Sequence, residues 1–252
     1  MGIYSYLPEA NGGFPATVTP AAYRNHGVID VSASDLTNAN DQKFGIGMGA
    51  GYIRERVETE LVFDSSGAPV IDAATGLQKT KKVIYRDVMG LGNIENHGTI
   101  RVTTPNSIGM YAGGKGSIAK NYGNIELSGT DLNVGMFLED EAVGYNYGHI
   151  YTTGTGNIGQ VGIAVLRGAT LYNMPGSTVT INSEDGIGIA IAGGIIANYG
   201  SFVVTPKQQE IINGAVITAT GDNGKAIANV TADASKAMGT SPINRVAINV
   251  PT

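Results

Sequence analysis

Apolar and polar residues alternate in short runs along this chain, and Gly interrupts the runs before they reach helical length. Residues 98–103, Gly-Thr-Ile-Arg-Val-Thr, and 178–181, Thr-Val-Thr-Ile, are examples. Strict alternation places apolar side chains on one face of a β-strand, whereas an amphipathic helix needs them three or four residues apart. The pattern predicts an all-β chain with strands of about four to six residues joined by turns.

The phrase Asn-x-Gly-x-Ile returns along the chain at an almost constant interval. Its copies, the last two of them looser, begin at Asn96, Asn121, Asn146, Asn173 and Asn198, which lie 25, 25, 27 and 25 residues apart. A second phrase, an apolar residue followed by Gly and an apolar run, keeps the same interval. Three strands and their turns fill about 25 residues, so the repeat predicts the stacked coils of a parallel β-helix.

In such a stack, the same position of each coil lies about 4.8 Å above its predecessor, and equivalent side chains form ladders. The five asparagines are predicted to stack at an internal bend, with each amide bonding the next. The Gly two residues after each Asn is expected to supply a positive φ for the corner. An internal apolar ladder is expected at Ile100, Ile125, Ile150, Val179 and Phe202.

The repeat opens at Asn25, so residues 25–252 are predicted to form the β-helix. Residues 1–24 fit the pattern poorly and are expected to be an N-terminal segment or cap. From Asn25 to Asn96 the interval grows to 71 residues, which indicates an insertion into one coil. The inserted residues 51–92 interleave β-forming and charged side chains around turn-rich segments. They are predicted to form a charged β-hairpin that projects from the first coils.

Charge is sparse, with 16 basic and 21 acidic side chains and a net charge of −5 in 252 residues. This balance offers no basic footprint for nucleic acid or for an anionic membrane surface. The apolar runs are too short to span a bilayer as helices, so no direct membrane insertion of this chain is expected. The absence of Cys removes disulfides, thiol catalysis and Cys-based zinc sites.

No cofactor and no metal site are expected. Residues 154–159 match the Gly-x-Gly-x-x-Gly dinucleotide pattern but lead into a strand rather than a helix. Acidic residues at 139–141 and 184–185 make a polysaccharide-cleaving β-helix an alternative function. Because Glu139 and Glu184 stand at different places in their repeats, they are predicted to lie apart in solvated turns. No catalytic residue is assigned.

The insertion is the strongest candidate for recognition, because solenoids place insertions on one face and loops carry binding residues. Its alternative role is a solubilising decoration that protects strand edges. The position after each repeat Asn is predicted to face outward, where its rings either hold a sugar or a partner's apolar anchor or merely cover the coil edge. The candidate ligand-binding residues are Arg54, Arg56, Lys79, Lys81, Lys82, Arg86, Tyr122, Tyr147 and Tyr199.

Residues 108–117, Ile-Gly-Met-Tyr-Ala-Gly-Gly-Lys-Gly-Ser, are followed at 121–125 by Asn-Tyr-Gly-Asn-Ile. This cadence resembles the repeat of the large fusobacterial autotransporter adhesins of the type V secretion pathway. The resemblance covers residues 96–202 closely. It implies a right-handed parallel β-helix displayed outside a Gram-negative cell and anchored to the outer membrane, which binds other bacteria or host-cell receptors and glycans.

The chain is therefore expected to be a non-enzymatic, extracellular adhesin fragment. Its expected partner is a receptor on a host cell or on another bacterium, either protein or glycan, and nucleic acid is not expected. A polysaccharide-cleaving enzyme and a purely structural stalk are the alternatives. A stalk would bind nothing through either the insertion or the aromatic ladder.

Overall fold

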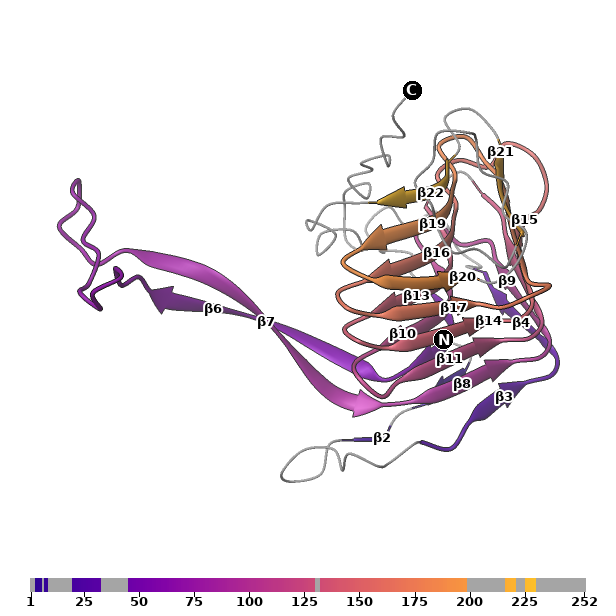
Figure 1. The fold of residues 1–252 in the computed structure, drawn as a ribbon, viewed down its shortest axis with the longest axis horizontal. Helices are drawn as coiled ribbons and strands as arrows, with labels where there is room; N and C mark the ends of the chain where they lie inside the picture. The colour runs from indigo at the N-terminus through magenta and orange to yellow at the C-terminus, as the bar shows by residue number, and fades with distance from the viewer. Residues whose placement is uncertain are drawn as a thin grey trace.

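The computed structural model describes residues 3–5, 7–8, 20–32, 45–129, 132–198, 216–220 and 225–229. Every regular element in these residues is a strand, and parallel strands stack as a β-solenoid (Figure 1). The predicted all-β solenoid is confirmed. Across the described ranges, no helix has the length and hydrophobicity needed to cross a membrane.

Three parallel sheets form the walls of the solenoid, and successive coils add one strand to each. Sheet 1 contains β1 (Ile3–Ser5), β5 (Ile46–Ala50), β10 (Ile108–Gly113), β13 (Val134–Glu139), β16 (Val161–Leu166), β19 (Ile187–Ala192) and β22 (Lys225–Asn229). Sheet 2 contains β3 (Tyr23–Asn25), β8 (Asn93–Asn96), β11 (Ile118–Asn121), β14 (Val143–Asn146), β17 (Thr170–Asn173) and β20 (Ile195–Asn198). Sheet 3 contains β4 (Val28–Val31), β9 (Thr99–Val102), β12 (Asn124–Leu127), β15 (His149–Thr152), β18 (Thr178–Asn182) and β21 (Val216–Thr220).

A ladder of asparagine side chains runs inside the bend between sheets 2 and 3. Each side-chain amide donates to the side-chain oxygen of the next rung at 2.8–2.9 Å, and every rung is buried. The rungs are Asn25, Asn96, Asn121, Asn146 and Asn173. The oxygen of Asn96 also accepts the backbone N–H of Gly98 at 3.2 Å, which satisfies a donor at the bend. The backbone of Asn198 pairs with Asn173, and its side chain lies outside the described part of the structure.

The Gly two residues after each ladder Asn is required for a different reason from the predicted one. Its φ is not positive at Gly98, Gly123 or Gly148, so the predicted left-handed corner is wrong. A Cβ on Gly123 would lie 2.0 Å from the carbonyl oxygen of Gly98 in the preceding coil, and Gly148 meets Gly123 in the same way. Only Gly fits, because the backbones of adjacent coils touch at this bend.

Two apolar clusters stabilise the coils. The larger one fills the interior, and each of its fully buried isoleucines contributes about 1.5–3 kcal/mol of transfer free energy. It includes the predicted ladder at Ile100, Ile125, Ile150 and Val179, whereas Phe202 lies outside the described residues. The second cluster takes the remaining apolar side chains of β13 and β16, such as Phe137 and Ala164. These two strands are therefore buried on both faces.

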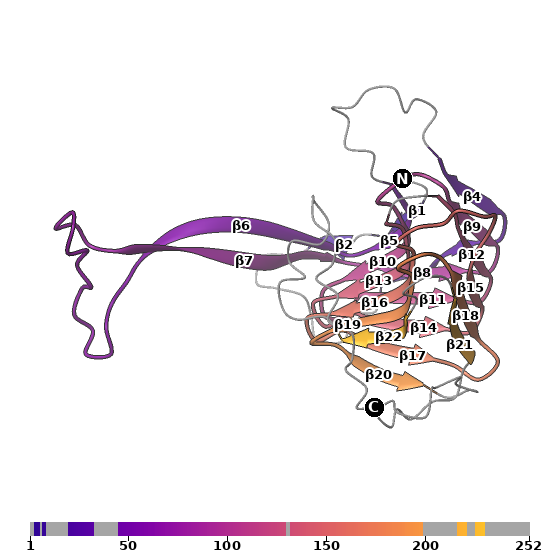
Figure 2. The same cartoon turned by 90° about the horizontal axis from the view of Figure 1, so that it is seen from above.

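The insertion forms a two-stranded antiparallel ribbon at the corner where the chain passes from sheet 1 to sheet 2. β6 (Tyr52–Leu61) pairs with β7 (Thr80–Leu91), and residues 62–79 connect them. We call residues 52–91 the arm and residues 62–79 the arm tip. Figures 1 and 2 show the arm projecting well away from the stacked coils. Near the N-terminus, β1 extends sheet 1, and β2 (Leu7–Pro8) pairs with the base of β7.

Gly123→Ala is expected to destabilise the solenoid, because its Cβ would overlap the carbonyl oxygen of Gly98 and force two coils apart. We expect the free energy of unfolding to fall by about 2 kcal/mol or more. Gly27→Ala is the matched control, since the same position in the first coil offers a Cβ no contact closer than Asn25 Oδ1 at 4.0 Å. Denaturant unfolding followed by circular dichroism measures both variants. Equal losses would contradict the close-approach explanation.

Candidate functional site

An ion-pair cluster attaches the arm to the solenoid at the corner between sheets 1 and 2. Arg86 of β7 pairs with Glu55 across the ribbon at 2.6 Å. It also pairs with Glu139 and Asp140, where β13 ends, at 2.8 and 2.9 Å. Arg167, which follows β16 in the next coil, pairs with the same two acidic residues. The arm and two successive coils are thereby joined through one set of charges.

Apart from Glu55, whose side chain is 44% exposed, this cluster is largely removed from solvent. The side chain of Glu139 is 8% exposed, and it accepts a hydrogen bond from the Tyr111 hydroxyl at 2.7 Å. Burial, together with repulsion from Arg86, lowers the pKa of Arg167 to about 10. Burial also raises the pKa of Asp140, even though Arg86 pairs with it. Removing one member of such a cluster leaves an uncompensated buried charge, so the pairs fix the direction in which the arm leaves the wall.

The expectation of solvated turns is wrong for Glu139 and holds for Glu184. Arg86, Arg167 and Tyr111 enclose the carboxylate of Glu139, whereas Glu184 is exposed and precedes β19. Carboxylates and arginines from adjacent coils therefore do converge at one corner. Guanidinium groups already engage both carboxylates there, an arrangement suited to attaching the arm.

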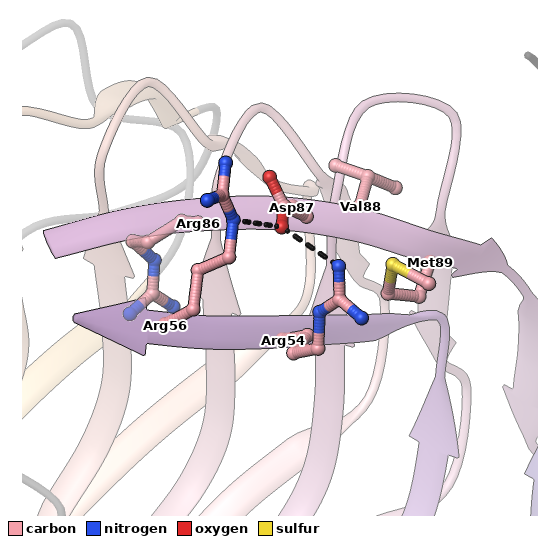
Figure 3. Close-up of a pocket in the computed structure, with 6 residues that line it drawn as sticks. All are labelled: Arg54, Arg56, Arg86, Asp87, Val88 and Met89. Atoms are coloured by element: carbon pink, nitrogen blue, oxygen red, sulfur yellow. Dashed lines mark hydrogen bonds and ion pairs between the residues drawn. The ribbon is translucent and has the colours of Figure 1, made fainter. Parts of the chain in front are cut away.

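An open groove of about 640 Å³ lies at the base of the arm (Figure 3). Its lining residues are Arg54, Arg56, Arg86, Asp87, Val88 and Met89. One oxygen of Asp87 pairs with Arg54 at 3.1 Å and with Arg56 at 2.8 Å, and these hydrogen bonds lower the pKa of Asp87. The guanidinium of Arg56 also lies 4.5 Å from the centroid of the Tyr85 ring. Three of the predicted cations thus meet at the arm base, and each is paired.

The three predicted lysines lie further along the arm and do not line this groove. Lys81 pairs with Glu60 across the ribbon at 3.4 Å, Lys82 lies opposite Thr59, and Lys79 ends the arm tip. All three lysines are exposed. The six cations therefore form two separate groups rather than one basic patch.

Backbone hydrogen bonds order the arm tip. The N–H of Val62 donates to the carbonyl of Lys79 at 2.9 Å, that of Lys79 to Val70 at 2.7 Å, and that of Val70 to Val62 at 3.0 Å. Two short turns leave this three-way junction, and Figure 1 shows them as separate loops. In each turn an aspartate, Asp64 or Asp72, accepts backbone N–H groups from the residues that follow it.

Exposed apolar side chains are concentrated on the arm. Of the thirteen exposed large apolar side chains among the described residues, seven belong to the arm. They are Tyr52, Val57, Leu61, Phe63, Ile71, Leu77 and Ile84. Sequence reasoning selected the charged half of the alternating pattern and missed this apolar half. The available signal was that Val57, Leu61 and Phe63 are separated by four and two residues. They therefore share one face of a strand in a segment with no core to face.

The predicted outward ladder of rings lies beside the asparagine ladder. His26, His97, Tyr122 and Tyr147 stack with centroids 4.6–4.9 Å apart and planes within 14° of parallel. His97 and Tyr122 have ring neighbours on both faces, so they present mainly their edges to solvent. Sugar rings stack on free aromatic faces, and this arrangement favours the covering role at those two positions. Tyr199 lies outside the described residues.

Glu95 lies next to this stack in a buried position on sheet 2. Arg24 at 2.6 Å and Lys120 at 3.2 Å pair with it from the neighbouring strands, and His97 lies 3.4 Å away. Burial by itself would raise the pKa of Glu95, but hydrogen bonds from Arg24, Lys120 and His97 outweigh it and lower the pKa to about 2. On the next two strands of sheet 2, Tyr145 and Tyr172 occupy the position equivalent to Glu95 and Lys120, and their rings stack at 5.0 Å.

Comparisons with protein families, with curated proteins and with solved structures each find no match for this chain. Within the parts of the chain that the structure describes, no group of three or more His, Asp or Glu residues is placed to hold a metal ion. The functional interpretation therefore depends on the geometry of the arm and the solenoid.

Arg86→Gln is expected to loosen the arm, because Glu55, Glu139 and Asp140 lose the cation they share. The free energy of unfolding should fall by about 2–4 kcal/mol, and the amides at the arm base should exchange hydrogen faster. Arg54→Gln is the control, since its side chain is 50% exposed and its ion pair is worth about 1 kcal/mol or less. Hydrogen exchange read by mass spectrometry compares the variants. Equal loss of protection in both would show that the cluster does not anchor the arm.

Glu95 should make part of the stability depend on pH. Its pKa is about 2 in the folded chain and near its ordinary value of 4.5 in the unfolded chain, so the unfolded state binds the proton more tightly. The stabilisation, on the order of 3 kcal/mol, is present above about pH 5 and is lost as the pH falls toward 2. Glu95→Gln should remove it and flatten the dependence of the urea midpoint on pH. Parallel curves for the two proteins would refute this role.

Proposed function

We propose that this chain is a non-enzymatic binding module of an adhesin, in which the solenoid is a rigid scaffold and the arm tip binds a protein on another cell. The observation that carries the proposal is the exposure of Phe63 (54%), Ile71 (51%) and Leu77 (69%) at the tip. Exposed apolar groups gathered in one place mark interaction sites on soluble proteins. The resemblance of the repeat to large autotransporter adhesins supports display outside a Gram-negative cell.

The form of the arm supports a binding role. β6 has ten residues, so the ribbon carries its tip about 33 Å from the wall. The hydrogen-bonded junction of Val62, Val70 and Lys79 orders the tip before any partner arrives. A preordered loop loses little conformational entropy on binding, and this raises affinity.

The side chains at the tip favour a protein partner over a glycan. Phe63, Ile71 and Leu77 have no side-chain hydrogen-bond donors or acceptors for sugar hydroxyl groups. A shallow apolar pocket on a protein would take them as anchors. The solubilising decoration is less well supported, because a decoration of that kind carries charge rather than exposed apolar groups.

The test is binding of the fluorescently labelled chain to cultured epithelial cells and to bacterial cells, measured by flow cytometry. A variant carrying Phe63→Ser, Ile71→Ser and Leu77→Ser is expected to bind at least about tenfold more weakly, because apolar anchors carry most of the binding energy. The matched control changes three exposed apolar residues of the solenoid, Val28→Ser, Ile158→Ser and Ile195→Ser, and should bind like the original chain.

Equal binding by the tip variant and the original chain would refute the proposed role of the tip, as would absence of binding to every cell tested. A glycan array run with the same two variants separates the partner classes. Binding to glycans that survives the tip substitutions would favour a sugar receptor at another surface.

A further inference from the structure

We infer that the outer edge of β6 pairs with the same edge in a second copy of this chain, so that two arms form one four-stranded antiparallel sheet. β6 is the last strand of its sheet, whose order is β2-β7-β6, and no strand of the described residues borders its outer side. An exposed strand edge of this length is a template for pairing with another chain. The inference concerns the edge of the arm and is independent of the proposed function of the arm tip.

The backbone of β6 presents hydrogen-bonding groups to this open edge at every second residue. The N–H of Val62 donates to the carbonyl of Lys79, which marks this pair as a hydrogen-bonded one in the ladder. Hydrogen-bonded and non-hydrogen-bonded pairs alternate along antiparallel strands. The residues that do not bond β7 are therefore Ile53, Glu55, Val57, Thr59 and Leu61. Their N–H and C=O groups point outward, toward the position of an added strand.

The charged face of β6 is complementary to itself when the second strand runs antiparallel about Val57. In this register, Arg54 lies opposite Glu60 of the second copy, and Arg56 lies opposite Glu58 of the second copy. Two-fold symmetry makes each contact twice. Opposite charges directly across a pair of strands are favourable, and like charges are unfavourable.

The neighbouring registers are less favourable. A shift of two residues in one direction places Arg56 against Arg56, and a shift in the other direction places Glu58 against Glu58. Both shifts keep the backbone hydrogen bonds but bring like charges together at the symmetry axis. Side-chain charge therefore selects the register centred on Val57.

The other face of the arm gains apolar contacts in the same register. Ile53 lies opposite Leu61 of the second copy, and Val57 meets its own counterpart. Val57 and Ile84 pair across the ribbon and are 62% and 54% exposed. In the joined sheet these two residues and their symmetry mates form one row across four strands. Pairing stabilises the arm because an isolated two-stranded ribbon is marginally stable, whereas a sheet of three or more strands is not.

The shape of the molecule permits this association. The arm projects clear of the stacked coils in both views, so its edge is accessible to a second arm (Figures 1 and 2). Because the two β6 strands run antiparallel, the two solenoids lie at opposite ends of the joined sheet, and the tip of each arm reaches the base of the other arm. The interface is closed by its two-fold axis, which limits the assembly to a dimer.

The test exchanges charges at the interface and measures association of the full chain by sedimentation velocity at low salt. Arg56→Glu places Glu against Glu58, and Glu58→Arg places Arg against Arg56, so each single variant should dissociate with a Kd at least about tenfold higher. An equimolar mixture of the two single variants should form a heterodimer. The double variant R56E/E58R should form a homodimer again, since opposite charges face each other in both cases.

A second pair of variants tests the backbone contact. Thr59→Pro removes an N–H that points to the open edge, so the ribbon keeps its own hydrogen bonds while the dimer is lost. Lys82→Pro removes the equivalent group from the residue directly opposite, on the other edge of the ribbon, and should leave the dimer intact. A chain that stays monomeric up to about 1 mM would overturn the inference. Equal Kd values for the original chain, R56E, E58R and T59P would also overturn it.

Discussion

Direct contact between the backbones of successive coils is the constraint on which this molecule depends. A Cβ on Gly123 would lie 2.0 Å from the carbonyl oxygen of Gly98, and one on Gly135 would lie 2.5 Å from that of Gly162. Coils can approach this closely only where the residue that faces the carbonyl oxygen carries no side chain. Beside the contact between Gly98 and Gly123, the buried asparagines bond to one another, and they also accept a backbone N–H of the bend. Close approach and amide bonding thus fix the register that aligns the apolar interior.

The arm follows different rules from the coils that hold it. A coil buries its apolar residues against its neighbours. In the arm, β6 and β7 pair only with each other along most of their length, and Val57, Ile84 and the tip remain in solvent. Its position depends on Arg86 and the acidic pair at Glu139 and Asp140. The solenoid therefore supplies a rigid corner, and the arm supplies surface that the solenoid cannot offer, because its own side chains already stack on one another.

Local periodicity was sufficient to predict the solenoid, the asparagine ladder and the inserted ribbon, because each depends on residues at fixed spacing. The reason for the glycines at the bend could not be read from one coil, since it depends on the distance to the coil before it. The ion-pair cluster at the corner also could not be predicted from the sequence. Arg86 and Glu139 are 53 residues apart in sequence and meet only because the arm leaves in one particular direction. The apolar residues of the arm look like ordinary strand residues until the absence of a core behind them is seen.

The asparagine ladder has a consequence for how this protein can change in length. Each rung donates to the next through the same two atoms, so a further coil can join the column without altering any existing bond. A change of a few residues within a strand would instead shift the glycines away from the carbonyl oxygens they must face. Addition or removal of a whole coil would therefore preserve the ladder, and it would move the arm nearer to or farther from the end of the solenoid in uniform increments.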